Sequence, residues 1–452
     1  MKINSIIEEI ESNYDTKSVD RNGLNFWLEF RNRFFYSLSI GKESNLIINS
    51  SVYLNVIRSI FYGFFNWFKG YDCWVLSSSL NRVELHNGYY DKLFDYPALK
   101  FKKTLFIELA TNGHYKRSKV ISKHIVSRAP LIMFEKLISL FISVKKIDVS
   151  LLDLIQQEYK TVIDPSYSIK KMVSQYKAMK LLLRLKKLPK TVFIAPLYMS
   201  FGYVKALKER GVVVVEAQHG VINKEHFGYN YHTEFDSNYF PDYLLSFGER
   251  EKEVFTEHNK YIDSNKVFPV GSFYIDYVND KYKLDIDHSK YRLSLSVSMQ
   301  DCGIGSKVLP FLISVSELNR DCLFLLKPRR TSISEYKSKY KIPSNIVFVE
   351  DLDVYQTILS SDFHITAYSS CALEAPALGV QNILLNIENK AKEYYFGILD
   401  ENTTSFVDTE EEFNNLISNL TSEIKPEVKG FHTQIIKTDY KKNIDEFFKL
   451  VR

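Results

Sequence analysis

The chain has 452 residues, more than one ordinary hydrophobic core can organise, and this length predicts two to three domains. A hydrophobic content of 45% and a charged content of 25% are typical of globular proteins, and the net charge of +5 is too weak to indicate a nucleic-acid-binding protein. Such a charge suits acidic ligands or an anionic membrane surface. The start, MKINSIIEEIESNYD, lacks the features of a signal peptide, and no apolar run reaches the ~18 residues of a membrane span. We therefore expect a cytoplasmic protein.

The four cysteines are scattered, as Cys73, Cys302, Cys322 and Cys371, and form no CxxC pair. Cys73, Cys322 and Cys371 lie in apolar contexts, so we expect small buried side chains. The sequence has no HExxH motif and no group of Cys and His with metal-binding spacing. Nothing in it indicates a zinc site.

Residues 1 to about 70 are predicted to form a helical N-terminal extension, because apolar residues such as Phe26, Leu28, Phe30 and Phe34 recur at helical spacing. The aromatic stretch 56–68 fits either a core helix or an amphipathic face that contacts lipid.

A second helical region is predicted between residue 129 and about 190, and its last part, 170–190, is rich in lysine. This basic segment is either a solvated helix face or one attracted to anionic phospholipid head groups. Both interpretations stay open from the sequence.

A first series of short apolar runs predicts the strands of one parallel sheet. The most persuasive is Val212–Val215, four β-branched residues in a row, which follows a helix predicted at Phe201–Arg210. The other predicted strands of this series are Asp72–Ser77, Lys103–Glu108, Val192–Ala195, Tyr243–Gly248 and Val267–Ser272.

The polar span Asp276–Lys290 is predicted to be a linker, and a second α/β series follows it. Its strands are predicted at Arg292–Val297, Leu323–Leu326, Ile346–Val349, Phe363–Thr366 and Asn382–Leu385. Helices are predicted at Lys307–Leu318, Val354–Ser360, Ala372–Leu378 and, at the end, Thr438–Leu450. The sequence thus predicts an α/β protein with two Rossmann-like, doubly wound domains that face a central cleft.

The Val212–Val215 strand is followed directly by Glu216, Gln218, His219 and Gly220, of which Glu216 and His219 are titratable. Ligands of open parallel sheets bind outside the carboxyl ends of strands. A histidine there can act as a general base or donate to a phosphate, and glycine lets a ligand approach the backbone. The bland alternative is a histidine that satisfies local backbone groups.

The second series carries two further candidate sites. Lys327, Arg329 and Arg330 follow a predicted strand and fit the binding of a diphosphate or carboxylate, although a solvated basic loop is the alternative. The stretch Thr366–Glu374 places hydroxyls at a predicted helix start, which can bind an anion or simply cap the helix. The chain has no GxGxxG after the first strand of either series and no GxxxxGK[ST], which speaks against a dinucleotide oxidoreductase and a P-loop enzyme.

Together these motifs resemble the GT-B glycosyltransferases, and within them the bacterial enzymes of capsule, O-antigen and lipopolysaccharide synthesis. The run ITAYSSCALEAPALGVQNILL is similar to the family's donor-binding stretch, and Ser369-Ser370 matches the Ser-Ser motif of Kdo- and sialyl-type transferases. Lys327-Pro328 stands where those enzymes carry His-Pro, so the sequence departs from them at the residue before the proline.

The resemblance implies an acceptor-binding domain at residues 1–280, a nucleotide-sugar-binding domain at 281–430 and a closing helix at 431–452. It implies a metal-independent enzyme without a cofactor, whose partners are a nucleotide-sugar donor, with CMP-linked Kdo or a sialic-type sugar as one option, and a glycan or lipid-linked glycan acceptor. A peripheral contact with anionic lipid on the cytoplasmic face of the inner membrane would fit the basic segment.

The resemblance also implies site residues. The catalytic candidates are His219, Glu216 and Glu108, with Asp236 as a further carboxylate in the N-terminal half. The expected donor contacts are Gln218, Gly220, Gln300, Lys327, Arg329, Arg330, Thr366, Ser369, Ser370 and Glu374.

Three other functions share the same overall pattern. A CDP-polyol phosphotransferase of the teichoic-acid type has similar His-Gly, Lys-Pro and Ser-Ser motifs. A sugar-nucleotide 2-epimerase and a non-catalytic assembly partner are the remaining alternatives, and the sequence does not give the stereochemistry of the reaction.

Overall fold

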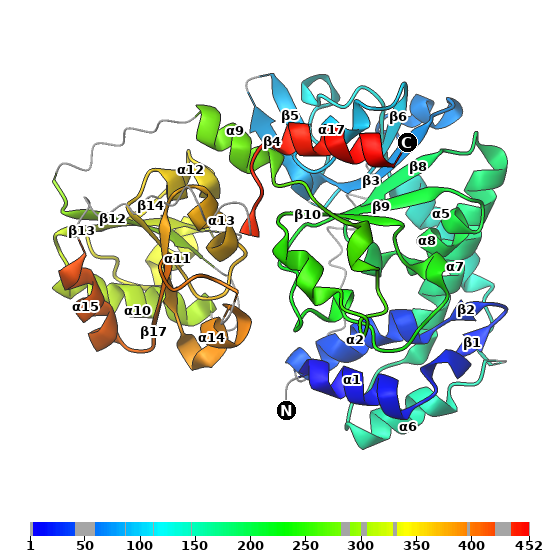
Figure 1. The fold of residues 1–452 in the computed structure, drawn as a ribbon, viewed down its shortest axis with the longest axis horizontal. Helices are drawn as coiled ribbons and strands as arrows, with labels where there is room; N and C mark the ends of the chain where they lie inside the picture. Colours follow the sequence, from blue (N-terminus) through cyan, green and yellow to red (C-terminus); the bar gives the residue numbers. More distant parts are fainter. Residues whose placement is uncertain are drawn as a thin grey trace. The chain divides into compact units, whose positions relative to one another are not determined.

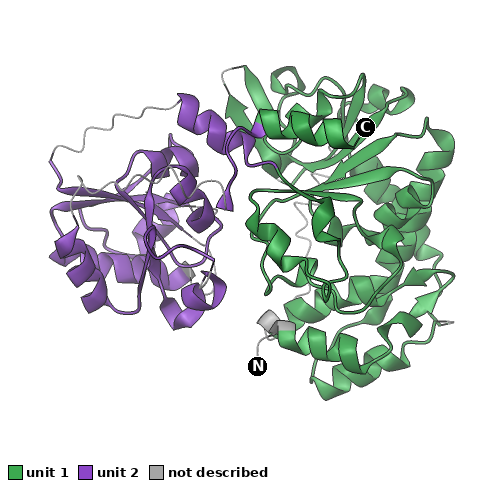
Figure 2. Cartoon of the chain, viewed as in Figure 1, with its two compact units in different colours: residues 1–269, 441–452 green, residues 270–440 purple. Residues whose placement is uncertain are grey.

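The computed structural model describes residues 3–40, 59–85, 87–111, 113–145, 147–281, 290–299, 305–328, 332–395, 398–420 and 435–451 (Figure 1). The chain forms two compact units, unit 1 with residues 1–269 and 441–452, and unit 2 with residues 270–440 (Figure 2). Each unit has its own parallel sheet and its own hydrophobic core.

The sheet of unit 1 has seven strands in the order β11-β10-β9-β8-β3-β6-β7, and every neighbouring pair is parallel. The first of these strands in the chain, β3, lies inside the sheet between β8 and β6, so the chain winds outward first to one side and then to the other, as in Rossmann folds. The strands are β3 (Cys73–Ser78), β6 (Thr104–Leu109), β7 (Ile125–Ser127), β8 (Thr191–Ile194), β9 (Val213–Ala217), β10 (Tyr243–Ser246) and β11 (Val267–Pro269).

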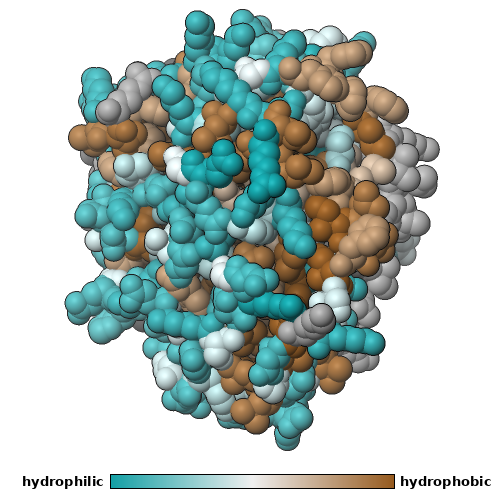
Figure 3. Space-filling model, turned by 90° about the vertical axis from the view of Figure 1, so that its right-hand side faces the viewer, coloured by the Kyte–Doolittle hydropathy of each residue, from teal (hydrophilic) through white to brown (hydrophobic). Residues whose placement is uncertain are grey.

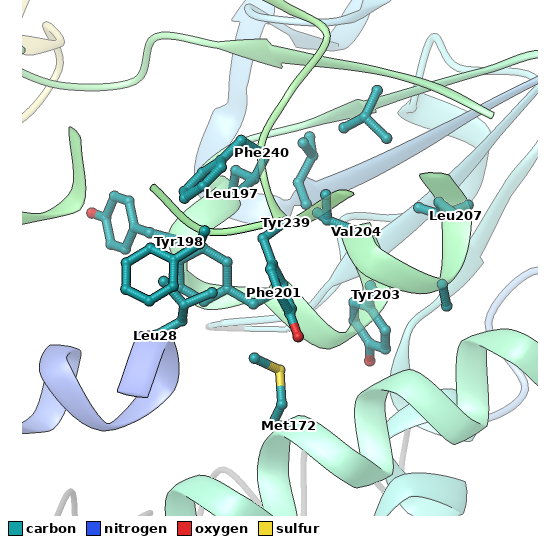
Figure 4. Packing of buried hydrophobic residues seen from close by; sticks show 14 of the residues in the cluster. Leu28, Met172, Leu197, Tyr198, Phe201, Tyr203, Val204, Leu207, Tyr239 and Phe240 are labelled. Atoms are coloured by element: carbon teal, nitrogen blue, oxygen red, sulfur yellow. The ribbon is translucent and has the colours of Figure 1, made fainter. Parts of the chain in front are cut away.

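Helices of unit 1 cover one face of this sheet and join it to the N-terminal layer. In α8, Phe201, Val204 and Leu207 recur at helical spacing and are fully buried, and they belong to the same core cluster as Met172 of α7 and Leu28 of α2 (Figure 4). The helices are α1 (Ile3–Asn13), α2 (Trp27–Ile40), α5 (Ala129–Leu140), α6 (Ser150–Glu158), α7 (Pro165–Leu185) and α8 (Phe201–Lys208). A short hairpin of β1 (Asp20–Arg21) and β2 (Leu24–Asn25) lies between the first two.

The segment between β3 and β6 forms an antiparallel hairpin of β4 (Arg82–Leu85) and β5 (Gly88–Asp91), followed by the short helix α4 (Asp95–Ala98). Gly88 has a φ of +129°, and a Cβ atom there would lie 2.1 Å from the carbonyl oxygen of Lys119. Only glycine fits this position, so the hairpin turn is encoded in the sequence.

The sheet of unit 2 has six parallel strands in the order β14-β13-β12-β15-β16-β17. This is again the Rossmann order, with the first strand, β12, beside the fourth, β15. The strands are β12 (Leu293–Ser298), β13 (Cys322–Lys327), β14 (Ile346–Phe348), β15 (Phe363–Thr366), β16 (Gln381–Leu385) and β17 (Thr404–Val407). Its helices are α10 (Gly305–Leu318), α11 (Ile333–Lys339), α12 (Val354–Leu359), α13 (Cys371–Ala377), α14 (Lys390–Tyr395) and α15 (Glu410–Asn419).

Two helices lie where the chain passes between the units. The predicted linker 276–290 is wrong in its first part, because α9 (Phe273–Lys281) continues to residue 281. Phe273 and Val278 are buried and anchor this helix. The predicted linker began at Asp276, three residues after Phe273, so the apolar start of the helix was not counted with its polar remainder. The helix predicted at Thr438–Leu450 is present as α17 (Tyr440–Leu450), of which residues 441–450 belong to unit 1.

The fold class is therefore confirmed as α/β with two Rossmann-like, doubly wound domains and helices at the N-terminus. The expected burial of Cys73, Cys322 and Cys371 is also confirmed, whereas Cys302 lies outside the described residues.

Candidate functional site

Glu216 lies inside the core of unit 1 and not at an open strand end. Alternate residues of a strand share a face, so Glu216 points to the same side as Val214, a core residue. Its carboxylate accepts hydrogen bonds from the Leu197 backbone N–H at 2.9 Å and from the Tyr261 hydroxyl. Burial raises the pKa of Glu216 to about 7 in spite of these donors. The carboxyl group thus fixes the loop that follows β8 and has no exposed surface.

Gln218 joins the ends of β9 and β10. Its side-chain amide donates to the Gly220 carbonyl at 2.9 Å and to the Glu251 carboxylate at 3.0 Å, and its carbonyl accepts from the Phe247 backbone N–H at 2.6 Å. These bonds use both ends of the amide, and the side chain is buried. Gln218 therefore shapes the turn on which the next residue, His219, is presented.

His219 keeps an exposed surface at this strand end. Desolvation of the imidazole by the surrounding protein atoms lowers the pKa of His219 to about 4, and the charge of Lys92 lowers it further. The ring is therefore neutral at pH 7 and offers one nitrogen as a proton acceptor. Of the candidates Glu108, Glu216 and His219, the histidine is the one that solvent can reach.

The Tyr229 hydroxyl connects the buried carboxyl group with the exposed imidazole. It lies 3.4 Å from the Glu216 carboxylate and 3.4 Å from Nδ1 of His219. A base whose second nitrogen contacts a third group is the arrangement found in catalytic dyads and triads. Sequence reasoning did not single out Tyr229, because nothing in its local sequence pattern points to β9.

Glu108, the other catalytic carboxylate that the sequence suggested, belongs to a buried charge cluster of Arg82, Asp91, Asp95 and Glu108. Arg82 donates to Glu108 through Nε at 2.7 Å and to Asp95 through Nη1 at 3.2 Å, and all four side chains are buried. Burial would raise the pKa of Glu108, but the hydrogen bonds from His114 and Arg82 outweigh it and lower that pKa. The cluster ties the β4–β5 hairpin to the carboxyl ends of β3 and β6.

Two nitrogens at this cluster have no hydrogen-bond partner among the described residues, Nη2 of Arg82 and Nε2 of His114. His114 places Nδ1 2.8 Å from Glu108 and stacks on Tyr62 with ring centroids 4.0 Å apart. Asp236, the remaining predicted carboxylate, pairs with Lys205 at 2.5 Å and caps a helical turn.

In unit 2, three of the predicted donor residues, Thr366, Ser369 and Ser370, lie at the carboxyl end of β15. Thr366 is buried and donates from Oγ1 to the Ser298 carbonyl at 3.3 Å, so it bridges β15 and β12. Ser369 accepts from the Cys371 backbone N–H at 3.4 Å, and Ser370 precedes α13 without a side-chain capping bond. Both serines are half-buried. Strands β12 and β15 are the pair at which the winding direction reverses, where ligands of open sheets bind.

Glu374 lies one turn into α13 and is buried. Its carboxylate accepts a hydrogen bond from the Tyr355 hydroxyl at 2.8 Å. Beneath this loop, His364 connects three strands, with Nε2 2.7 Å from the Ser298 hydroxyl and Nδ1 2.8 Å from the Asn382 side-chain oxygen. Burial lowers the pKa of His364 to about 4, so this support of the loop is uncharged.

The Lys327 ammonium group donates to the carbonyls of Val349 at 3.1 Å and of Glu350 at 3.0 Å. It therefore holds the chain after β14. Three other predicted donor residues, Gln300, Arg329 and Arg330, lie outside the described residues.

The described part of the chain contains no group of three His, Cys, Asp or Glu that could hold a metal ion. Within the same residues, no helix combines the length and the apolar character needed to cross a bilayer.

No protein-family model matches the sequence, nor does any curated protein. Solved structures match at low identity. The UDP-GlcNAc 2-epimerase from Neisseria meningitidis bound to UDP-GlcNAc has a TM-score of 0.50 at 13% identity, over 84% of this chain and 99% of that one. The S. aureus MnaA–UDP structure has a TM-score of 0.50 at 13% identity, over 84% and 97%. The UDP-GlcNAc 2-epimerase from Methanocaldococcus jannaschii has a TM-score of 0.50 at 11% identity, over 84% and 99%. At these identities the likeness shows the fold alone.

Proposed function

We propose that the chain is a GT-B glycosyltransferase that moves a sugar from a nucleotide-sugar donor to a bacterial surface glycan. The observation that carries the proposal is the set of polar groups at the β12–β15 switch point. Ser369 and Ser370 offer hydroxyls there, and Glu374 offers a carboxylate one turn into the helix that follows. Hydroxyls suit the phosphates of a nucleotide, and a carboxylate suits its ribose hydroxyls.

In this proposal, unit 2 binds the donor and stabilises its leaving group. Lys327 stands at the end of β13, and Arg329 and Arg330 follow it in the sequence. Cations that hold the donor's phosphate groups would neutralise the charge that develops when the bond between the sugar and the phosphate breaks. The finer expectation of a CMP-linked Kdo or sialic-type donor belongs to the same proposal.

Unit 1 supplies the acceptor side. His219 takes the proton of the acceptor hydroxyl as the new glycosidic bond forms, and the Tyr229 hydroxyl orients the imidazole from the side of Glu216. Glu216 and Glu108 act as positioning residues, because each is buried and bonded to its own unit.

The enzyme contacts anionic lipid at the cytoplasmic face of the inner membrane. The segment before β3 exposes 78% of Phe61, 78% of Phe65 and 71% of Phe68, and the end of α5 exposes Leu140. Figure 3 shows apolar side chains gathered on the face of unit 1 that contains α5 and α7. Lys186 lies 5.4 Å from the centroid of the Phe68 ring, which brings the basic segment to the aromatic one. Flotation with vesicles that contain or lack phosphatidylglycerol tests this contact, and no flotation with either kind would refute it.

A sugar-nucleotide 2-epimerase is the second candidate, because two of the solved structures with a TM-score of 0.50 carry the name UDP-GlcNAc 2-epimerase. The two reactions differ in their need for an acceptor. An epimerase converts UDP-GlcNAc alone, whereas a transferase releases nucleotide only with an acceptor glycan.

Two measurements test the proposal. Thermal shifts with CMP-, UDP-, GDP-, dTDP- and CDP-linked sugars identify the donor, and a CDP-polyol that stabilises the protein best would favour a phosphotransferase. NMR of the stabilising donor, with and without candidate acceptors, then separates transfer from epimerisation. If no nucleotide shifts the melting temperature, the chain is a non-catalytic assembly partner and the proposal fails.

A further inference from the structure

A cavity of about 590 Å³ lies at the amino end of the sheet of unit 1. Its residues come from the first positions of β8, β9 and β10, from the loop before β6, and from the end of α17, all in unit 1 (Figures 1 and 2). The volume falls within the range of about 300–1,000 Å³ that is usual for small-molecule sites.

The floor of this cavity is apolar. Val213 and Val215 occupy alternate positions of β9 and therefore face the same side of the sheet. Phe447 and Phe448 of α17 pack against the same sheet, with Phe447 5.7 Å from the Tyr243 ring and Phe448 5.6 Å from the Phe101 ring, centroid to centroid. Such a floor offers hydrocarbon contacts and no amide or carboxylate for a nucleobase, so it favours an aliphatic ligand.

The rim of the cavity is cationic. Lys102 and Lys190 are exposed, and their ammonium groups make no hydrogen bond or ion pair with another residue that the structure describes. Of the rim carboxylates, Asp72 pairs with Lys187 at 2.7 Å and Asp445, beside the cavity, pairs with Lys100 at 2.6 Å. Lys187 lowers the pKa of Asp72 through this hydrogen bond, and the charges of Lys190 and Lys102 lower it further. Two cations thus remain for a ligand.

We propose that this cavity binds an amphipathic anion, with a hydrocarbon chain on the Val213–Phe447 floor and a phosphate or carboxylate head group at Lys102 and Lys190. Apolar floor and charged rim match the two ends of such a molecule. Its role is that of an effector, because the strands are parallel and the cavity lies at their amino ends. His219 lies beyond the carboxyl end of β9, which has five residues. At the rise of a β-strand, this length places His219 roughly 15 Å or more from the cavity.

Isothermal titration of the full chain with decyl phosphate, kept below its micelle concentration, tests the proposal. We expect one decyl phosphate per chain, weaker binding of the neutral decyl maltoside, and weaker binding of inorganic phosphate. Val213→Trp, at a position that is 37% exposed, should fill the cavity and weaken the binding of decyl phosphate at least tenfold. Lys102→Ala with Lys190→Ala should weaken it about fivefold, as expected for two exposed charge contacts. Lys177→Ala, an exposed lysine of α7, is the matched control and should change nothing.

The proposal is overturned if Val213→Trp folds, by its circular dichroism, and binds decyl phosphate as the parent does. The double lysine variant alters only exposed side chains, so unchanged affinity in it overturns the anionic part even if the tryptophan variant fails to fold. If decyl maltoside binds as tightly as decyl phosphate, the anionic part of the proposal is likewise overturned. If the protein binds phosphatidylglycerol vesicles but not monomeric decyl phosphate, the lysines contact a membrane surface and the cavity does not bind the ligand. None of these results depends on the nucleotide chemistry proposed above.

Discussion

The two Rossmann-like units have the same strand order at their centres but differ in the groups at the carboxyl ends of their sheets. In unit 1, four ionisable residues form the buried charge cluster of Arg82, Asp91, Asp95 and Glu108. In unit 2, the polar groups around β12 and β15 are hydroxyls, the amide of Asn382 and the neutral His364, and Lys327 and Glu374 lie beside them without forming an ion pair that the structure describes.

The difference separates groups that hold the fold from groups that can meet a ligand. Ions buried together have lost their water and depend on one another, so they are committed to the hairpin that they fasten. Neutral hydroxyls lose less on burial and can exchange one partner for another. By this argument, the ligand-binding polar groups of unit 2 should tolerate substitution with little loss of stability, whereas those of the unit 1 cluster should not.

The largest effect is expected for Arg82→Met. Removal of one partner from a buried ionic group leaves the Glu108 and Asp95 carboxylates uncompensated, which costs about 3–5 kcal/mol. Urea unfolding followed by tryptophan fluorescence measures this loss of unfolding free energy for unit 1 alone, because the three tryptophans, Trp27, Trp67 and Trp74, all lie there. Lys252→Ala, which removes an exposed pair with Glu249, is the control and should cost less than about 1 kcal/mol. Equal costs for the two variants would refute the claim that the buried charge cluster holds the fold of unit 1.

His219→Ala comes next. Loss of a general base lowers turnover about 100- to 10,000-fold, while the exposed position predicts an unchanged urea midpoint. Steady-state kinetics with the donor identified by thermal shift measures the effect. Tyr229→Phe, which removes the hydroxyl 3.4 Å from Nδ1, should lower turnover less and alter its pH profile. Full activity in His219→Ala would leave the histidine with a structural role.

The sequence was informative wherever a physical pattern is local. Strands of a parallel sheet are buried on both faces and appear as short apolar runs, which is why the strands on either side of Glu216 and Thr366 could be predicted. Composition and spacing likewise identified α8 and α17. The fold class therefore followed from patterns that extend over a few residues.

Sequence reasoning failed where contacts join distant segments. The burial of Glu216 depends on Tyr229 and Tyr261, whose positions no local pattern predicts. The hairpin that brings Arg82 to Glu108 had one available signal, the Asn87-Gly88 pair, which is typical of tight hairpin turns. His364 was missed because one histidine inside a strand gives no sign of its partners.

The pH dependence of stability should have opposite signs at two buried groups. The pKa of Glu216 is raised from its ordinary 4.5 to about 7, so the native state keeps a proton that the unfolded state releases, and this contribution declines as pH rises from 4.5 to 7. The pKa of His364 is lowered from 6.5 to about 4, so its contribution declines as pH falls from 6.5 to 4. We expect Glu216→Gln to be about 2–3 kcal/mol more stable than the parent at pH 8 and nearly equal to it at pH 5. Tryptophan fluorescence during urea unfolding reads this in unit 1, and a difference that does not grow with pH would contradict the assignment.

The smallest effect is expected for Lys327→Met, and it separates the two roles that this lysine can have. Its two hydrogen bonds to backbone carbonyls are partly exposed, so their loss should cost only about 1 kcal/mol in the unfolding of unit 2, read by far-UV circular dichroism. If Lys327 also binds the donor phosphates, the same variant should lower the affinity for the donor about tenfold or more. The small loss of stability does not explain an effect of that size. Lys307→Ala, an exposed lysine paired with Glu388 in the same unit, is the control for charge alone. A large loss of stability with unchanged donor affinity would make Lys327 resemble the buried cluster of unit 1, a charge committed to its own fold.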